Sequence, residues 1–192
     1  MSAGQDTNES SHGTEAVLWL CESDSTAALK RLVAQDCRLV ASAAQAGVPL
    51  SRAMDGALTS LDAACVSLVA ASDRAAAALL LALERPAQIA SLVLLAPKIF
   101  DASGQPLSEP AARFNAVEVP ILALFGTKDA AAPPEAARHY RQRNPRCHLV
   151  FVYDASEAMG EERPEAVAEL VVDFVTRRDR FIVRQHADML YR

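Results

Sequence analysis

Short, unbroken apolar runs alternate along most of the chain with longer segments in which apolar residues recur at helical spacing. A short continuous apolar run is typical of a strand that is covered on both faces of a sheet. Six such runs are predicted to form strands, at residues 16–21, 38–42, 65–70, 91–96, 119–125 and 148–153.

The intervening segments predict five helices, at residues 26–34, 51–64, 73–85, 133–144 and 163–177. Ser25 and Ser51 stand where they can cap the first two, because a serine side chain accepts a hydrogen bond from the free N–H groups of a first turn. The third helix is apolar nearly all round, which predicts burial on more than one side. Residues 97–118 carry Pro, Ser and Gly and are expected to be irregular.

Strands that alternate with helices predict parallel βαβ units with right-handed crossovers. We therefore expect an α/β fold, a three-layer sandwich of about six mostly parallel strands with helices on both faces. The length of 192 residues suits a single domain. We place this domain at residues 15–178, between a disordered tail (1–14) and a C-terminal extension (179–192).

Composition and charge narrow the functional classes. The net charge of −5 argues against nucleic-acid binding, which normally requires a basic excess. The apolar run 75–83 is too short to span a bilayer, and the polar N-terminal residues lack the apolar stretch of a signal peptide. The cysteines lack zinc-type spacing. We therefore expect a soluble, cytoplasmic protein that binds no membrane, nucleic acid, metal or cofactor.

Three segments, in the right order, resemble the α/β-hydrolase family over residues 16–177. The first, VSLVAASDRAAAALLLALERPAQIASLVLLAP, is similar to the strand, nucleophile elbow, helix and following strand of that family. The second, PILALFGTKDAAAPPE, resembles the strand and loop that carry the acid of the catalytic triad. The third, ERPEAVAELVVDFV, resembles the helix that follows the catalytic histidine. The resemblance implies the hydrolase fold, whereas activity has to be judged residue by residue.

The resemblance places Ser72 at the position of the nucleophile and Asp129 at the position of the triad acid. A serine between a strand and a helix is also a common cap, and an aspartate after a strand commonly forms a turn. In the family, small residues lie two before and two after the nucleophile, because the strand and the helix approach closely there. Here these residues are Ala70 and Arg74, so the elbow is altered on its helix side.

The base of the triad is missing. Counting back from the ERPE segment, the resemblance places Glu157 where the family has its histidine. A serine hydroxyl needs a well-placed base to become a nucleophile, and a carboxylate with an ordinary pKa of about 4.3 is a poor base at neutral pH. Because Glu157 beside Asp129 brings two negative charges together, we expect Arg74 to pair with one of them.

Other catalytic and structural features of the family have no counterpart in this sequence. After the first of these strands the family usually has His-Gly, in a loop whose N–H stabilises the oxyanion. This sequence has Cys21-Glu22-Ser23-Asp24 instead. The first two strands of the family find no match, and residues 97–118 are too few for a helical cap domain. The chain is expected to be a truncated and catalytically degenerate relative.

His186 is the one histidine placed where it could replace the missing base. His12 lies in the tail, His139 is expected to face solvent, and His148 begins a strand at the far edge of the site. The extension 179–192, which carries His186, mixes apolar residues with arginines and packs either on its own domain or on a second subunit. The sheet edge left without the first two strands is another surface for a partner chain.

These observations leave alternative functions open. The first is a pseudoenzyme, a hydrolase-fold protein that has lost hydrolase activity and serves in binding or assembly, with itself or with another protein. The second is a residual serine esterase or thioesterase that acts through Ser72, with Asp129, Glu157 or His186 in an altered relay. A third, a receptor for a small molecule, is weakened by the absence of a lid.

Overall fold

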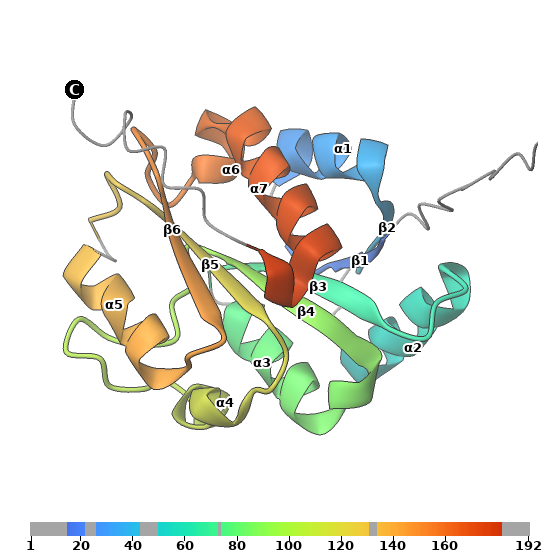
Figure 1. Cartoon of the computed structure of the whole chain (residues 1–192), viewed down its shortest axis with the longest axis horizontal. Helices are drawn as coiled ribbons and strands as arrows, with labels where there is room; N and C mark the ends of the chain where they lie inside the picture. The colour runs from blue at the N-terminus through green and yellow to red at the C-terminus, as the bar shows by residue number, and fades with distance from the viewer. Residues whose placement is uncertain (1–14, 22–25, 43–49, 73, 131–133, 182–192) are drawn as a thin grey trace, which may run out of the picture.

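A computed structural model of the chain describes residues 15–21, 26–42, 50–72, 74–130 and 134–181. Six strands form one sheet in the order β2-β1-β3-β4-β5-β6, and every neighbouring pair is parallel (Figure 1). The strands are β1 (Ala16–Trp19), β2 (Arg38–Ala41), β3 (Val66–Ala71), β4 (Ile89–Leu95), β5 (Ile121–Gly126) and β6 (Cys147–Val152). The predicted α/β fold with six parallel strands is confirmed.

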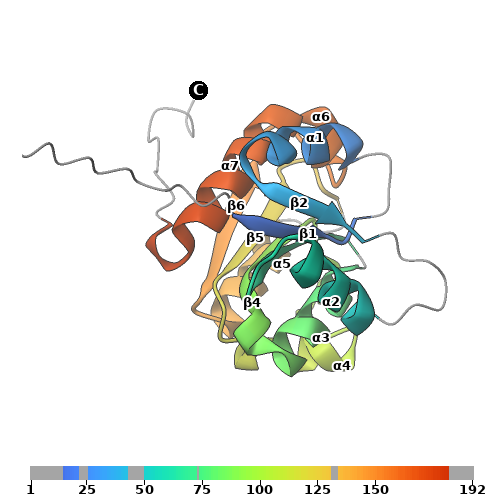
Figure 2. The same ribbon diagram turned by 90° about the vertical axis from the view of Figure 1, so that its right-hand side faces the viewer.

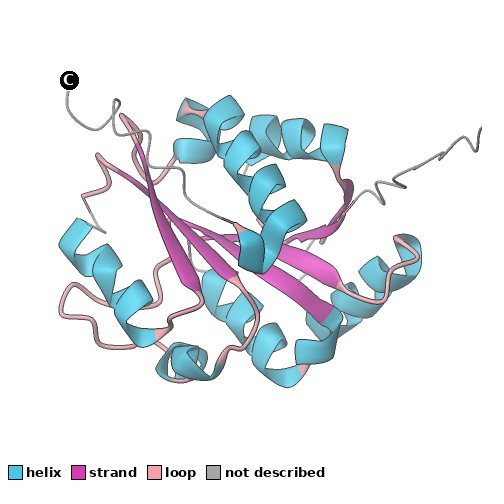
Figure 3. Ribbon diagram, in the orientation of Figure 1, coloured by secondary structure: helices cyan, strands magenta, loops and turns pink. Residues whose placement is uncertain are grey.

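Helices cover both faces of the sheet, so the architecture has three layers (Figure 2 and Figure 3). One face carries α1 (Ala27–Asp36), α6 (Met159–Glu162) and α7 (Pro164–Arg177). The other face carries α2 (Leu50–Ser60), α3 (Arg74–Glu84), α4 (Glu109–Ala112) and α5 (Pro134–Arg143). None of the described helices combines the length and the apolar character that crossing a membrane requires.

The two hydrophobic cores follow from the alternation of side chains along each strand. On β1, Val17 and Trp19 pack into the core beneath α1 and α7, whereas Ala16 and Leu18 pack into the core beneath α2 and α3. Because successive side chains point to opposite faces of a sheet, a strand between two helix layers has to be apolar throughout. The central strands therefore appear in the sequence as unbroken apolar runs, while β2 and β6 at the edges are only partly buried.

The starts of the first two helices differ from the prediction. Helix α2 begins at Leu50, so Ser51 lies inside the helix and its predicted role as a cap is wrong. Leu50 packs against the core, and residues 43–49 ahead of it lie outside the described residues. The predicted cap Ser25 lies outside the described residues, and Thr26, at the cap position of α1, makes no capping hydrogen bond with its side chain.

The segment 97–118 is less irregular than its composition indicates. It contains the short helix α4 and a 3₁₀ turn at Phe114–Ala116. Ser108 caps α4, because its side chain accepts a hydrogen bond from the Ala111 N–H. The segment also makes an isolated antiparallel bridge between Phe100 and Pro106.

The described part of the C-terminal extension packs on its own domain. After a 3₁₀ turn at Arg178–Arg180, Phe181 is buried. The centroid of its ring lies 5.3 Å from that of Phe174 on α7 and 5.5 Å from that of His148 on β6. The remainder of the extension, with His186, and the tail 1–14 with His12 lie outside the described residues.

Candidate functional site

The connections of the sheet change direction between β1 and β3. From β1 the chain crosses to β2 on one side, and it then returns to form β3 on the other side. In open α/β sheets, ligands bind beyond the carboxyl ends of the strands at such a point, because the diverging connections leave a crevice. Thr26, which follows β1, and Ser72, which follows β3, therefore lie where the topology predicts a site.

Ser72 forms the turn between β3 and α3 in a left-handed conformation, with φ of 50°. Its N–H donates to the Leu95 carbonyl at 2.9 Å, and its carbonyl accepts from the Lys98 N–H at 3.2 Å. These bonds fasten the turn to the end of β4 and to the segment that follows. The fold thereby holds a backbone conformation that costs energy for any residue except glycine.

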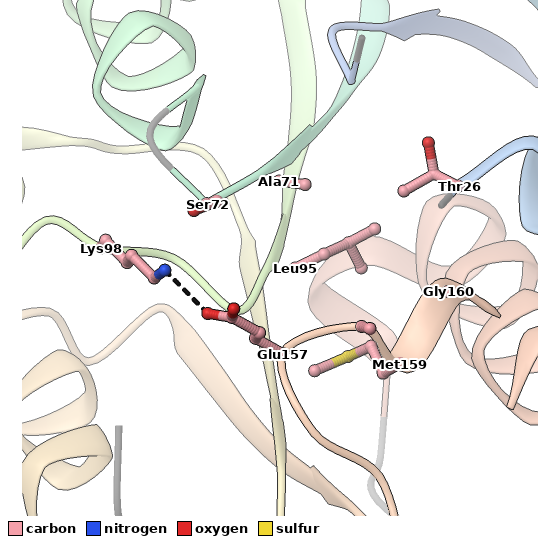
Figure 4. A pocket seen from close by; sticks show the side chains of 9 residues that line it. Thr26, Ala71, Ser72, Leu95, Lys98, Glu157, Met159 and Gly160 are labelled. Atoms are coloured by element: carbon pink, nitrogen blue, oxygen red, sulfur yellow. Dashed lines mark ion pairs between the residues drawn. The ribbon is translucent and has the colours of Figure 1, made fainter. Parts of the chain in front are cut away.

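Ser72 lines a cavity of about 200 Å³. Lys98 and Glu157 line it with Ser72 at one end, and the side chains of Leu95 and Met159 lie toward the other end (Figure 4). The cavity therefore has a charged end and a second end lined by Leu95, Met159 and the hydroxyl-bearing Thr26. Its lining comes from four separate loops and strand ends, since Thr26 also contributes.

Glu157 does lie in the same cavity as Ser72, as the resemblance implies. Its carboxylate forms an ion pair with the Lys98 ammonium at 2.7 Å, shown by the dashed line in Figure 4. We expected Arg74 to pair with Glu157 or Asp129. The cation that pairs with Glu157 is Lys98, and a pair between Arg74 and Asp129 stays a prediction. The sequence signal for Lys98 is its place just after β4, at the carboxyl edge of the sheet.

The loop that carries Glu157 is held at both ends. Asp154, at φ of 58°, pairs with Lys128 and, at 2.7 Å, with Arg163. Both contacts lower the pKa of Asp154, that of Lys128 more strongly. Ser156 donates its N–H at 2.6 Å and its hydroxyl at 2.8 Å to the Glu162 carboxylate. These bonds lower the pKa of Glu162 and close the loop on itself.

The loop also packs directly on the end of β5. The Lys128 N–H donates to the Ala155 carbonyl at 2.8 Å. At Gly126, a Cβ would lie 2.6 Å from the carbonyl carbon of Ala155 and closer still to the carbonyl oxygens of Ala155 and Ser156. The absence of a side chain at Gly126 is therefore what lets this loop approach the strand.

Asp129 is separated from the Ser72 cavity. It is 7% exposed and lines a smaller cavity of about 20 Å³ with Phe100 and Tyr140. Lys98 lines both cavities. Burial raises the pKa of Tyr140, whose hydroxyl donates to the Pro97 carbonyl at 2.6 Å. Ser72 and Glu157 thus line one cavity and Asp129 lines another, with Lys98 lining both.

Neither of the described histidines lines the Ser72 cavity. His148 lies between the rings of Phe174 and Phe181, and burial lowers its pKa. His139 is partly buried rather than solvent-facing, because its ring packs against Gly104. No base of the kind that a serine hydrolase uses is therefore present around Ser72 in the part of the chain that the structure describes.

Neither a reactive thiol nor a cluster of metal ligands is found among the described residues near the site. Burial raises the pKa of Cys21 to about 12 and that of Cys147 to about 12, so neither is a nucleophilic thiolate at neutral pH. Residues Glu22–Asp24, which replace the oxyanion loop of the family, lie outside the described residues. Within the described ranges, no three His, Cys, Asp or Glu side chains cluster so as to hold a metal ion.

Comparison with known proteins supports the fold. No family model matches the sequence, and no curated protein matches it. A predicted CIB-like hydrolase from Thermoplasma acidophilum matches in structure with a TM-score of 0.64 and 16% identity, covering 90% of this chain and 89% of that chain. A haloalkane dehalogenase from Bradyrhizobium elkani matches with a TM-score of 0.64 and 15% identity, covering 84% and 90%.

A thioesterase domain from the curacin biosynthetic pathway is similar as well, with a TM-score of 0.63 and 15% identity over 83% of this chain and 91% of that chain. Likeness at this level of identity establishes the α/β-hydrolase fold. Whether the chain catalyses a reaction has to be judged from its own residues.

Proposed function

We propose that this chain, whose fold is that of the α/β-hydrolases, has lost hydrolase activity and uses the Ser72 cavity to bind a small molecule without covalent chemistry. The observation that carries the proposal is the ion pair between Glu157 and Lys98 at 2.7 Å, in the place where a hydrolase needs a basic histidine.

The chemistry of serine activation explains why this pair matters. A serine hydroxyl attacks a carbonyl only when a neighbouring group removes its proton. A carboxylate is a weak base for that proton at neutral pH, and one carboxylate oxygen of Glu157 is already in contact with the Lys98 ammonium. A cavity with one positive and one negative side chain is instead suited to holding polar ligands.

A second function is a residual esterase or thioesterase activity through Ser72. Two observations favour it, namely the left-handed turn at Ser72, with φ of 50°, and the cavity of about 200 Å³ that the residue lines. Strained turns of this kind are typical of the nucleophile elbow. A base would then have to come from a residue outside the described ranges, such as His186.

Labelling with a serine-reactive fluorophosphonate separates the two functions. The full-length protein and the Ser72→Ala variant are incubated with the probe, alongside an active serine hydrolase as a positive control, and the modified residue is identified by mass spectrometry. The binding function predicts no probe on Ser72. Labelling of the wild-type protein that disappears in Ser72→Ala would overturn it and establish the second function.

An assembly role is a separate part of the proposal, carried by the edge strand β2. Arg38 and Ser42 donate their N–H groups at 2.9 Å to the carbonyls of Glu15 and Trp19. Because backbone groups alternate in direction along a strand, Leu39 directs its N–H and carbonyl away from β1. Among the described residues no strand lies beyond β2, and an unpaired edge is a template for a second copy of the chain.

Sedimentation equilibrium tests this assembly. We expect the wild-type protein to dimerise through β2. Leu39→Pro should be monomeric, because proline removes the N–H that would bond to the second copy, and the bonds between β2 and β1 do not use this N–H. Monomeric wild-type protein at the concentrations tested would contradict the assembly role, and it would leave the binding role of the cavity unaffected.

A further inference from the structure

The polar end of the Ser72 cavity presents both signs of charge. The Lys98 ammonium and the Glu157 carboxylate are 2.7 Å apart, and their side chains are 44% and 56% exposed. Both groups therefore remain in contact with solvent at the mouth of the cavity, next to Ser72 (Figure 4). A ligand that enters meets a positive and a negative group together.

A ligand with a single charge does not suit this arrangement. An anion that approaches Lys98 also meets the Glu157 carboxylate, and a cation that approaches Glu157 also meets the Lys98 ammonium. Like charges this close repel each other, so either ligand has to separate the ion pair. A head group with an ammonium and a carboxylate on one carbon atom matches each protein charge with its opposite, and the ion pair stays in place.

The end of the cavity near Leu95 and Met159 limits the size and the polarity of the rest of the ligand. Leu95 and Met159 line it and are 2% and 0% exposed, so a ligand reaches them when the methionine side chain, which is unbranched and adapts readily to the shape of an apolar group, shifts. The volume of about 200 Å³ admits only a small molecule. A short apolar group is therefore the part of the ligand that this end favours.

We propose that the Ser72 cavity binds a zwitterionic α-amino acid with a short apolar side chain. The carboxylate of the ligand meets Lys98, its ammonium meets Glu157, and its side chain packs against Leu95 and Met159. This inference rests on the proposed function, since it requires a ligand that is held without modification of Ser72.

Isothermal titration calorimetry with the full-length protein tests the inference, with L-leucine as the probe. Two analogues each lack one charge, namely 4-methylpentanoate, without the ammonium, and 3-methylbutylamine, without the carboxylate. We expect L-leucine to bind and each analogue to bind at least tenfold more weakly. Labelling Met159 with a ¹³C methyl group gives an independent readout, because its NMR signal should shift on addition of L-leucine.

Substitutions at the ion pair test the assignment of the two charges. Lys98→Gln and Glu157→Gln should each weaken L-leucine binding at least tenfold, and because both side chains are exposed, the fold should be retained, as circular dichroism can verify. Lys30→Gln and Glu165→Gln make the same chemical changes outside the cavity and should leave binding unchanged.

Three results would overturn the ligand class: no L-leucine binding at millimolar concentration, equal binding of either singly charged analogue, or unchanged binding in both cavity variants. None of these bears on the fluorophosphonate experiment, whose labelling of Ser72 would instead overturn the proposed function itself.

Discussion

The Lys98 ammonium lies 2.7 Å from the Glu157 carboxylate, so the residue that the family resemblance aligns with the catalytic histidine forms an ion pair with a lysine of the same cavity. Lys98 follows β4 and Glu157 follows β6, and both line the cavity that Ser72 lines. The Glu157 carboxylate is thereby engaged with a cation. Lys98 also lines the small cavity that Asp129 lines.

We expect Ser72 to be unreactive because a carboxylate, that of Glu157, stands at the position that the resemblance assigns to the histidine base. The variant Glu157→His puts an imidazole on a loop that lines the Ser72 cavity, and general-base assistance contributes about 10²–10⁴-fold to such reactions. We therefore predict that Glu157→His is labelled by a fluorophosphonate at least tenfold faster than the wild-type protein. The double variant Ser72→Ala/Glu157→His should show no labelling, and an unlabelled Glu157→His protein would show that more than the base has been lost.

The left-handed turn at Ser72 is predicted to carry a cost in stability. With φ of 50°, a serine is strained by about 1–2 kcal/mol, whereas glycine adopts this conformation freely. Ser72→Gly should therefore leave the free energy of unfolding unchanged or raise it by up to about 1 kcal/mol, measured by urea denaturation.

Ala71→Gly is the matched control for this prediction, because Ala71 ends strand β3 and does not have a positive φ. It should lower the free energy of unfolding by about 0.5–1 kcal/mol. If Ser72→Gly destabilises the protein as much as Ala71→Gly does, the turn is not strained.

Gly126 is predicted to tolerate no side chain. A Cβ there would lie 2.6 Å from the Ala155 carbonyl carbon, so Gly126→Ala must push the backbone of the Glu157 loop away from β5. Overpacking of this kind costs about 1–3 kcal/mol, and we expect the melting temperature to fall accordingly. Gly56→Ala provides the contrast, since a Cβ at this position in α2 meets nothing within 4 Å, and it should stabilise the protein by about 0.5–1 kcal/mol. Equal effects of the two substitutions would contradict the close approach at Gly126.

The bond between Ser156 and Glu162 predicts a change in the Glu157 loop at acidic pH. The Ser156 N–H and hydroxyl hold the pKa of Glu162 below its ordinary value of 4.5. A depressed pKa in the folded state means that the stabilisation is present above the unfolded value and is lost as the pH falls through the folded value. The amide resonance of Ser156, followed by ¹H–¹⁵N NMR, should therefore shift in a transition whose midpoint lies below pH 4.5.

Glu162→Gln removes the titrating group and should abolish this transition of the Ser156 amide. A midpoint at or above pH 4.5 in the wild-type protein would show that the Ser156 bonds do not favour the ionised carboxylate.

Most of the fold could be predicted because a strand that is buried on both faces appears in the sequence as an unbroken apolar run. The run around Leu92–Leu94 is apolar because both faces of β4 are covered. The position of Ser72 and its cavity partner Glu157 could be inferred from the order of segments around them. A helix start such as Leu50 could not, because a serine signals a possible cap without fixing which residue begins the helix.

The partner of Glu157 was beyond prediction for a related reason. Lys98 and Glu157 are far apart in the sequence, and their loops meet only because β4 and β6 lie in the same sheet with β5 between them. The hydrophobic pattern reports which strands are buried, and it carries no information on how the loops beyond their ends pair. A lysine on a distant loop therefore pairs with Glu157, and the alternative that Arg74 pairs with Asp129 stays a prediction.

The cavity is built from residues spread along nearly the whole described chain, from Thr26 to Gly160. They come from four segments that are far apart in the sequence, so an unfolded chain does not offer a ligand the assembled cavity. Any molecule that occupies the cavity therefore adds to the stability of the entire domain, by an amount that grows with the logarithm of its concentration above its Kd. If the protein binds without turnover, as proposed, the supply of ligand would then set the stability of the folded chain.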